Sequence, residues 1–315
     1  MPSELYEKPI LIVGVMRSGT TLLNRILNAH PQLYFFYNQT DFLRRYNNKY
    51  DPLNENTFFK FLNDYKLHMN QLQIEISDHE IEIIRNFIKE HYISYKNLYL
   101  ALAISHLQPS DNGRWGEKYA GFGVEQQRFI DLFPKGQVIA ITRNLVDVYI
   151  SNKEKVKREN PQAYERGDHL LILDDWRQFT KNWREFTRKA ENNSYLHITY
   201  EDLLSNPITI TKKICAFLNL EWSNDMIDEK KLVYEDGKIW NANTSFDYKI
   251  MGLDKNNIGR HRKEILNDEL ELIQFLEKNY AMKKSDDQLH AMPINNPLVQ
   301  KLESVVSMWK SARNY

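Results

Sequence analysis

The sequence predicts an α/β fold, in which helices flank both sides of a central parallel sheet. Three short, mostly apolar segments indicate its strands: residues 9–15 (PILIVGV), 138–142 and 195–200. Segments of this length and character are typical of strands buried on both faces. A helical pattern follows each of them after a short connection. Strands and helices that alternate in this way are typical of a sheet built from βα units.

Apolar residues recur at helical spacing between these strands. The aromatic side chains of Trp176, Phe179, Trp183 and Phe186 form one stripe, which predicts a long helix packed on the core. Residues 34–70 mix aromatic, amide and charged side chains, and we interpret them as a partly helical lid that faces the substrate. Residues 108–116 (QPSDNGRWG) are interpreted as a loop. The other predicted helices cover residues 21–30, 78–105, 124–133, 206–218, 268–280 and 297–312.

Nothing in the chain marks a boundary between domains. There is no internal repeat, low-complexity tract or linker, so we predict a single domain over residues 1–315. Its core spans about residues 9–280, followed by an amphipathic helical tail over about residues 285–315. The apolar face of that tail is expected to dock on the body of the protein or to form a homo-oligomer.

Composition excludes several classes of protein. Lys plus Arg and Asp plus Glu both number 42, so the basic excess typical of nucleic-acid-binding domains is missing. A single cysteine excludes an internal disulfide and a multi-cysteine metal site. Neither a signal peptide nor an apolar run of roughly 18 residues is present, so we expect a soluble, cytoplasmic protein without a membrane partner.

The strongest local signal is the segment Gly14–Thr21 (GVMRSGTT), between the first strand and the first helix. Backbone N–H groups of such a turn converge on an anion, and the helix N-terminus adds partial positive charge. Glycine allows close approach of the backbone, and Ser18, Thr20 and Thr21 offer hydroxyl donors. The segment therefore predicts a phosphate-binding loop in which Arg17 supplies a further charge.

Two features distinguish this loop from that of a kinase or ATPase. Thr20 occupies the position of the lysine that contacts the β- and γ-phosphates of a nucleoside triphosphate. The strand over residues 138–142 leads into Arg143 rather than into an aspartate that could hold magnesium. A donor that needs neither a triphosphate nor a metal ion fits these residues better.

The loop resembles the 5′-phosphosulfate loop of sulfotransferases that use 3′-phosphoadenosine 5′-phosphosulfate (PAPS). The run GVMRSGTTLLNRILNAHP is similar to the tyrosylprotein sulfotransferases and their bacterial relatives. A second match is Arg143 with Ser151, which in the family bind the 3′-phosphate of the donor. The resemblance implies a P-loop-like sulfotransferase fold, no metal, and donor contacts from the loop residues Arg17, Ser18, Gly19, Thr20, Thr21 and Leu22.

Three weaker matches extend this resemblance. Tyr200 begins a YEDL segment whose tyrosine approaches the adenine in the family. Thr244 and Phe246 resemble residues that pack on the adenine. Lys255 and Arg260 lie where the family has a glycine-rich turn over the 3′-phosphate, although the run DKNNIGRHRKE departs from the Arg-Lys-Gly pattern.

Catalysis requires charge neutralisation on the leaving phosphate and a base for the acceptor proton. Arg17 and Lys118 are predicted for the first task, since Lys118 lies close to where the family's catalytic lysine precedes the 3′-phosphate arginine. The base is less clear. Ala120 occupies the position of the cytosolic histidine, and Asn38 that of the tyrosylprotein glutamate. Asp41 is the nearest carboxylate and ranks first, ahead of Glu117 and His30.

We therefore predict transfer of a sulfuryl group to a hydroxyl or nitrogen of a small-molecule acceptor, such as a natural product or glycan. The acceptor pocket is expected from residues 34–50 and 97–123, whose aromatic and amide side chains suit a compact molecule. Two alternatives remain open. One is a P-loop small-molecule or nucleotide kinase, and the other is a nucleotide-binding relative without catalysis.

Overall fold

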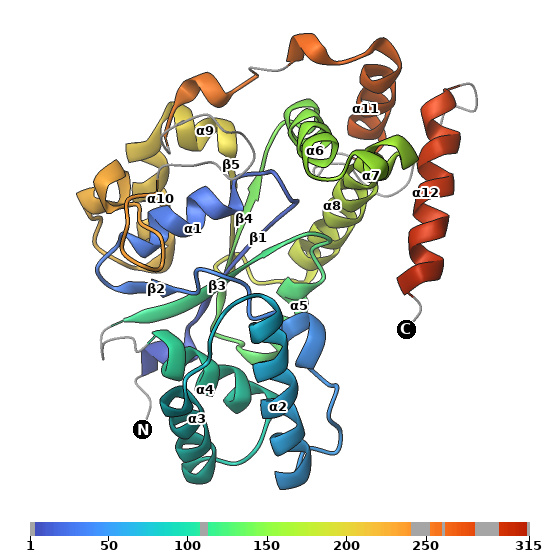
Figure 1. The fold of residues 1–315 in the computed structure, drawn as a ribbon. Coiled ribbons are helices and arrows are strands. Elements are labelled where there is room, and N and C mark those ends of the chain that lie inside the picture. Colours follow the sequence, from blue (N-terminus) through green and yellow to red (C-terminus); the bar gives the residue numbers. More distant parts are fainter. Residues whose placement is uncertain (1–3, 108–112, 241–252, 260–261, 281–295, 314–315) are drawn as a thin grey trace.

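The computed structural model describes residues 4–107, 113–240, 253–259, 262–280 and 296–313. Five parallel strands in these residues form one sheet with the order β2-β3-β1-β4-β5 (Figure 1). They are β1 (Ile10–Gly14), β2 (Leu33–Phe35), β3 (Arg114–Ala120), β4 (Gln137–Thr142) and β5 (Tyr195–Thr199). The predicted α/β class with a central parallel sheet is confirmed.

The central position of β1 determines which loops meet. Ile12 of β1 pairs with Lys118 of β3 on one side and with Ile139 of β4 on the other. In a parallel sheet the carboxyl ends of all strands lie at one edge, so the loops after β1, β3 and β4 adjoin. The N–H of Gly121 donates to the carbonyl oxygen of Gly14 at 2.9 Å and joins two of these loops directly.

Helices cover both faces of the sheet (Figure 1). Those of the described residues are α1 (Thr20–Asn28), α2 (Glu55–Gln71), α3 (Asp78–Glu90), α4 (Tyr95–Leu107), α5 (Glu125–Leu132), α6 (Leu145–Glu159), α7 (Pro161–Arg166), α8 (Leu171–Lys189), α9 (Tyr200–Ser205), α10 (Pro207–Leu218), α11 (Asn267–Tyr280) and α12 (Pro297–Arg313). Short turns are η1 (Glu4–Glu7), the π-helical η2 (Phe42–Tyr46), η3 (Asp168–Leu170), η4 (Asn224–Ile227), η5 (Glu229–Lys231), η6 (Lys255–Asn257) and η7 (Arg262–Glu264).

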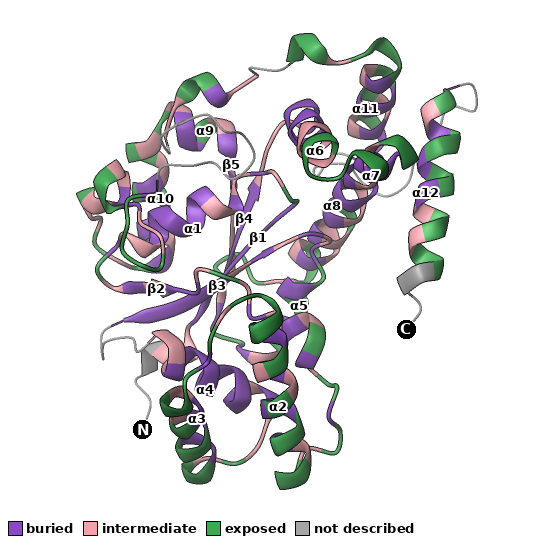
Figure 2. Cartoon of the chain, viewed as in Figure 1, coloured by how far each residue is buried: buried purple, intermediate pink, exposed green. Residues whose placement is uncertain are grey.

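Each face of the sheet has its own hydrophobic core. Ile10 and Ile12 of β1 pack with the apolar side chains of α1, α9 and α10. Leu11 and Val13 point to the opposite face, where α4, α5, α6, α8 and α11 contribute the larger core. Figure 2 shows the strands buried between these layers, while the outer faces of α2 and α3 are exposed. The alternation of side chains along β1 therefore explains why its continuous apolar run is needed.

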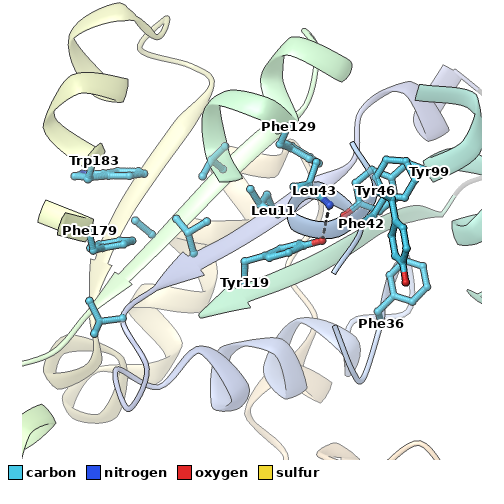
Figure 3. Packing of buried hydrophobic residues seen from close by; sticks show 14 of the residues in the cluster. Leu11, Phe36, Phe42, Leu43, Tyr46, Tyr99, Tyr119, Phe129, Phe179 and Trp183 are labelled. Carbon is cyan, nitrogen blue, oxygen red and sulfur yellow. Dashed lines mark hydrogen bonds between the residues drawn. The ribbon is translucent and has the colours of Figure 1, made fainter. Parts of the chain in front are cut away.

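Residues 34–70 differ from the lid that the sequence predicts. They form most of β2, η2 and most of α2, and most of their aromatic side chains belong to the main core. Phe42 stacks on Tyr99 of α4 with ring centroids 4.5 Å apart (Figure 3). Tyr46 packs edge-on to Phe61. Tyr119 of β3 accepts the N–H of Leu43 at its hydroxyl oxygen, at 3.1 Å. The aromatic content of this segment therefore reflects core packing rather than a substrate-facing surface.

The interpretation of residues 108–116 as a loop is wrong from Arg114 onward, where β3 begins. The sequence RWGEKYA does not show the apolar pattern of a buried strand, because two charged residues lie at its centre. Glu117 is fully buried, and Thr40 and Tyr99 donate hydrogen bonds to its carboxylate. These hydrogen bonds offset the desolvation of a buried carboxyl group, so a strand that does not look apolar is stable in the sheet.

The predicted C-terminal helix is present as α12, with Val299, Leu302 and Val305 buried. It packs on α8 and α11, so its apolar face docks on the body of the protein. Oligomerisation through this helix stays a prediction. Among the described residues, none of the helices is both long and apolar enough to cross a lipid bilayer.

Candidate functional site

The turn between β1 and α1 has the geometry of an anion-binding loop. Arg17 and Gly19 both have positive φ, at 73° and 95°, and the N–H of Ser18 closes the turn on the carbonyl of Val15 at 3.1 Å. A Cβ on Gly19 would lie only 2.5 Å from Cδ2 of Tyr200. Glycine is therefore required here both for backbone conformation and for close packing.

The first turn of α1 presents backbone N–H groups that the helix does not use. The first bond of the helix runs from the N–H of Leu23 to the carbonyl of Gly19, at 3.0 Å. The N–H groups of Thr20, Thr21 and Leu22 precede it, and no side chain caps them. Together with the positive end of the helix dipole they favour a bound anion. The side chain of Leu22 itself is buried in the core, so it is not available to a ligand.

The residues predicted to bind the two ends of a bisphosphorylated donor are in direct contact. Nε of Arg17 donates to Oγ of Ser151 on α6 at 3.1 Å. Arg143, which follows β4, donates from Nη1 to the carbonyl oxygen of Arg17 at 3.4 Å. Its guanidinium lies over the ring of Tyr200, 4.5 Å from the centroid. These contacts bring together Arg17, Arg143, Ser151 and Tyr200 at the carboxyl edge of the sheet.

The positive charges of Arg17 and Arg143 lie close together and are not neutralised by a hydrogen-bonded carboxylate from the described residues. Burial and the nearby charge of Arg143 lower the pKa of Arg17 to about 10. Among the described residues no carboxylate hydrogen-bonds to either guanidinium, and Nε of Arg143 is buried without a hydrogen-bond partner. Two neighbouring cations repel each other, and an anion between them removes that cost. These residues fit the phosphate groups of PAPS.

A turn from the C-terminal part of the chain covers this site. The carbonyl oxygen of Asn257 accepts a hydrogen bond from Nη2 of Arg143 at 3.0 Å. The N–H of Gly259 and the guanidinium of Arg262 both bind the carboxylate of Asp147 on α6. The side chain of Lys255 is exposed on the same turn. The predicted residues Thr244, Phe246 and Arg260 lie outside the described residues.

Lys118 lies on the face of β3 that carries α1, opposite to Glu117. Burial lowers its pKa to about 8, and the charge of Arg25 on α1 acts in the same direction. Among the described residues, its ammonium group has no hydrogen-bond or ion-pair partner. A partly desolvated cation of this kind is suited to neutralise charge that develops on a leaving group.

The three bases considered from the sequence are all engaged elsewhere. Asp41, at the start of η2, accepts a hydrogen bond from Nε of Arg45 at 3.2 Å and lies 3.8 Å from Nε2 of His68. Glu117 is enclosed in the core, where burial raises its pKa to about 7. His30 is buried, and its Nε2 lies 2.8 Å from the carbonyl oxygen of Glu221.

Sequence reasoning missed a group of polar residues beside Lys118. Arg25 is 7% exposed although it lies in the apolar part of α1, and its guanidinium stands 4.5 Å from the ring centroid of Tyr37. His106 of α4 contacts the carboxylates of both Glu80 and Glu235 at 3.1 Å. The buried charge of Arg25 was the one available signal. The contact between His106 and Glu235 could not be predicted from the sequence, because 129 positions separate the two residues.

No cluster of three or more potential ligands for a metal ion occurs in the part of the chain that the structure describes. The loop after β4 provides Arg143 where a magnesium-binding carboxylate would be needed.

Comparisons with known proteins agree with this geometry. The sulfotransferase domain of the olefin synthase from Synechococcus PCC 7002 has a similar structure, with a TM-score of 0.53 and 16% identity, over 95% of this chain and 94% of that domain. Mouse sulfotransferase SULT7A1, solved as a complex with PAP, matches with a TM-score of 0.50 and 14% identity, over 89% of this chain and 86% of that one. These likenesses concern the fold.

A curated relative from Aquifex aeolicus, described as an uncharacterized protein, is 21% identical over 233 residues, or 71% of this chain. The chain spans only about a quarter of the length of that relative, 27%. The family model described as "Sulfotransferase family" matches residues 9–224, which include the β1–α1 turn, Lys118, Arg143 and Ser151. This chain belongs to the sulfotransferase family.

Proposed function

We propose that the protein transfers the sulfuryl group of PAPS to a hydroxyl or amine nitrogen of a small-molecule acceptor and releases PAP. The observation that carries this proposal is the contact between Arg17 and Ser151, with Arg143 beside them. A donor that bears phosphate at both the 3′ and 5′ positions offers anionic groups to both arginines. A nucleotide with phosphate at a single position would leave one of these cations uncompensated.

Each residue then has a distinct task. The N–H groups of Thr20, Thr21 and Leu22 and the guanidinium of Arg17 hold the 5′-phosphate, and Arg143 and Ser151 hold the 3′-phosphate. Bound PAPS supplies a sulfuryl group on a phosphate leaving group. Lys118 neutralises the charge that develops on the leaving oxygen. Tyr200, which packs against both Gly19 and Arg143, keeps the two phosphate sites in register.

A compact, uncharged or weakly charged acceptor fits the described residues better than an acidic polymer. Arg44, Arg45 and Lys49 are the basic residues of the segment first considered for the acceptor. Each is paired with a carboxylate, from Glu125, Asp41 and Asp64 respectively. Their charges are therefore not available for a sulfated or carboxylated polysaccharide. A natural product or a neutral glycan remains the proposed acceptor class.

Calorimetry with PAP and with ATP–Mg²⁺ tests the donor. We expect selective binding of PAP, since the site has two cations for its two phosphate positions and no metal-binding carboxylate after β4. Preference for ATP–Mg²⁺ would instead identify a kinase and overturn the proposal. Tight binding of PAP without release of PAP from PAPS in the presence of any acceptor would identify a nucleotide-binding relative that has lost catalysis.

A further inference from the structure

The turn over residues 232–240 places a carboxylate at the edge of the sheet. Its two ends are anchored, since Leu232 and Trp240 are buried in the core beside α1, and the N–H of Trp240 donates to the carbonyl of Leu232 at 2.7 Å. Glu235 stands at the tip with its side chain 45% exposed. Nδ2 of Asn38, just beyond β2, donates to its Oε2 at 3.3 Å. The carboxylate therefore reaches the carboxyl end of β2.

Glu235 belongs to the same group of side chains as Lys118. Phe35 of β2 pairs with Gly116 of β3, and Tyr37 and Lys118 each lie two residues farther along. Arg25 stacks on Tyr37, and its charge lowers the pKa of Lys118. Burial lowers the pKa of Arg25 and raises that of Tyr37, and the charge of Glu235 acts on both groups to raise the pKa. Arg25 and Tyr37 thus connect Glu235 to the lysine of the reaction centre.

His106 holds this carboxylate in place. Its Nε2 lies 3.1 Å from Oε1 of Glu235, and its Nδ1 lies 3.1 Å from Oε1 of Glu80. Its ring stacks on Phe36 at a centroid distance of 5.4 Å. Glu80 is fixed in turn, because its Oε2 accepts the N–H and the hydroxyl of Ser77 in the capping box of α3. An ionised carboxylate can only accept, so both ring nitrogens carry a proton and His106 is an imidazolium.

We propose that Glu235 is the general base that takes the acceptor proton, and that His106, fixed by Glu80, positions it. The inference rests on the proposed function, because it needs an acceptor beside Lys118. Glu117 is enclosed in the core, and the Asp41 side chain is 19% exposed and bound by Arg45, whereas the Glu235 side chain is 45% exposed to solvent. The imidazolium also keeps Glu235 ionised: the hydrogen bond from His106 lowers its pKa, and the charge of Arg25 lowers it further.

In the proposed step, sulfuryl transfer and proton transfer occur together. A lone pair on the acceptor oxygen or nitrogen forms the new bond to sulfur. The bond between sulfur and the bridging oxygen breaks, and its electron pair stays on the 5′-phosphate of PAP. The proton of the acceptor passes to Oε of Glu235, while its bonding pair remains on the acceptor atom. No metal, oxidant or further reactant is needed.

Glu235→Gln tests the base, with Asp236→Asn as the matched control on the same turn, since Asp236 binds only Lys238 within the described part of the chain. Release of PAP from PAPS is measured with phenol, para-nitrophenol and water as acceptors. With phenol we expect a loss of about a hundredfold in Glu235→Gln. The loss should be small with para-nitrophenol at a pH where it is already ionised, because no proton is then removed. Asp236→Asn should match the parent.

Measurement of PAP binding distinguishes a failure of the proposed function from a failure of the assignment of Glu235 as the base. If the parent does not bind PAP in calorimetry, the proposed function fails. If Glu235→Gln binds PAP as the parent does and turns over phenol equally fast, only the base assignment fails. A parent that binds PAP but releases none from PAPS with any of the three acceptors is the non-catalytic relative described above, and this result overturns the proposed function together with the base assignment.

The role of His106 is tested by pH dependence. The groups that face Glu235 from the described elements are His106 on α4, Arg25 on α1, and Tyr37 and Asn38 after β2, with Glu80 behind His106. Activity requires ionised Glu235, so it falls as the pH falls through the pKa of that carboxyl group. His106→Gln removes the main cause of the lowered pKa, so the acidic limb of the profile should move to higher pH. An unmoved limb would reject the positioning role.

A readout independent of turnover completes the test. The carboxylates of Glu235 and Glu80 raise the pKa of His106, with the Glu235 contribution the larger. NMR titration of His106 should therefore show its pKa falling toward the ordinary range in Glu235→Gln and unchanged in Asp236→Asn. If the pKa of His106 is the same in the parent and in Glu235→Gln, the contact does not exist in solution and the inference is overturned.

Discussion

Replacement of Lys118 by alanine is expected to lower the turnover number about a thousandfold without weakening PAP binding. The ammonium group acts on charge that appears only as the bond to the leaving oxygen breaks. It has no carboxylate partner among the described residues, so the deletion removes stabilisation of the transition state and little else. Rates of PAP release from PAPS, together with calorimetry of PAP, measure the two quantities separately. Equal turnover by Lys118→Ala and the parent would eliminate this residue from the reaction.

The pH dependence of the parent adds a second test of the same residue. Because burial lowers the pKa of Lys118 to about 8, the free enzyme loses the charged form as the pH rises through that value. We expect an alkaline limb in kcat/KM near this pH. In Lys118→Arg the guanidinium stays charged, so the limb should disappear while part of the activity remains. A limb that persists in this variant would belong to another group.

Replacement of Arg143 by alanine is expected to weaken PAP binding by a few hundredfold, or about 3–4 kcal/mol, as when one partner of a buried charge pair is removed. Its guanidinium binds the carbonyl oxygens of Arg17 and Asn257, and its buried Nε has no hydrogen-bond partner among the described residues. Arg143→Ala therefore removes a positive charge and a hydrogen-bond donor from the site. It also removes the side chain that connects the β1–α1 turn to the 255–259 turn.

Calorimetry of PAP with Arg143→Ala and with Arg85→Ala distinguishes a local contact from a general effect of charge. Arg85 lies on α3, and its guanidinium stands 5.8 Å from the ring centroid of Phe59. Arg85→Ala removes the same formal charge and should leave the affinity close to that of the parent. Equal losses in both variants would mean that Arg143 acts only through long-range attraction, and no 3′-phosphate site would then be assigned to it.

The proposed donor site could be located from the sequence because its candidate residues lie in short, local segments of the chain. Residues 9–30 contain a strand, a turn with glycine and the N-terminus of a helix. In such a segment the backbone N–H groups of the turn and of the first helical turn point to one place. Arg143 and Ser151 likewise follow a single strand and occupy the next helix. The distance between the β1–α1 turn and the Arg143–Ser151 segment could not be predicted from the sequence. The sheet order places β1 next to β4, and this pairing brings Arg17 into contact with Ser151.

The acceptor side could not be predicted in the same way. Strand β3 is obscured by Glu117 and Lys118, whose charges are tolerated because one is hydrogen-bonded in the core and the other lies at the site. The aromatic residues 34–50 gave a misleading signal, since burial in a core and exposure in a pocket require the same side chains. A sequence pattern records polarity, but not which partner compensates a buried charge.

By itself the sequence determined the parallel α/β architecture, the anion-binding turn and the absence of kinase features at Thr20 and Arg143. These follow from periodicity and from backbone geometry over a few consecutive residues. Only the tertiary structure decided that Glu80, His106 and Glu235 meet at the end of β2, the strand that pairs with the Lys118 strand β3. They come from two helices and a distant turn, and their contact depends on how α3, α4 and the 232–240 turn pack around the edge of β2. Interactions of this range are set by the whole core, so no local pattern encodes them.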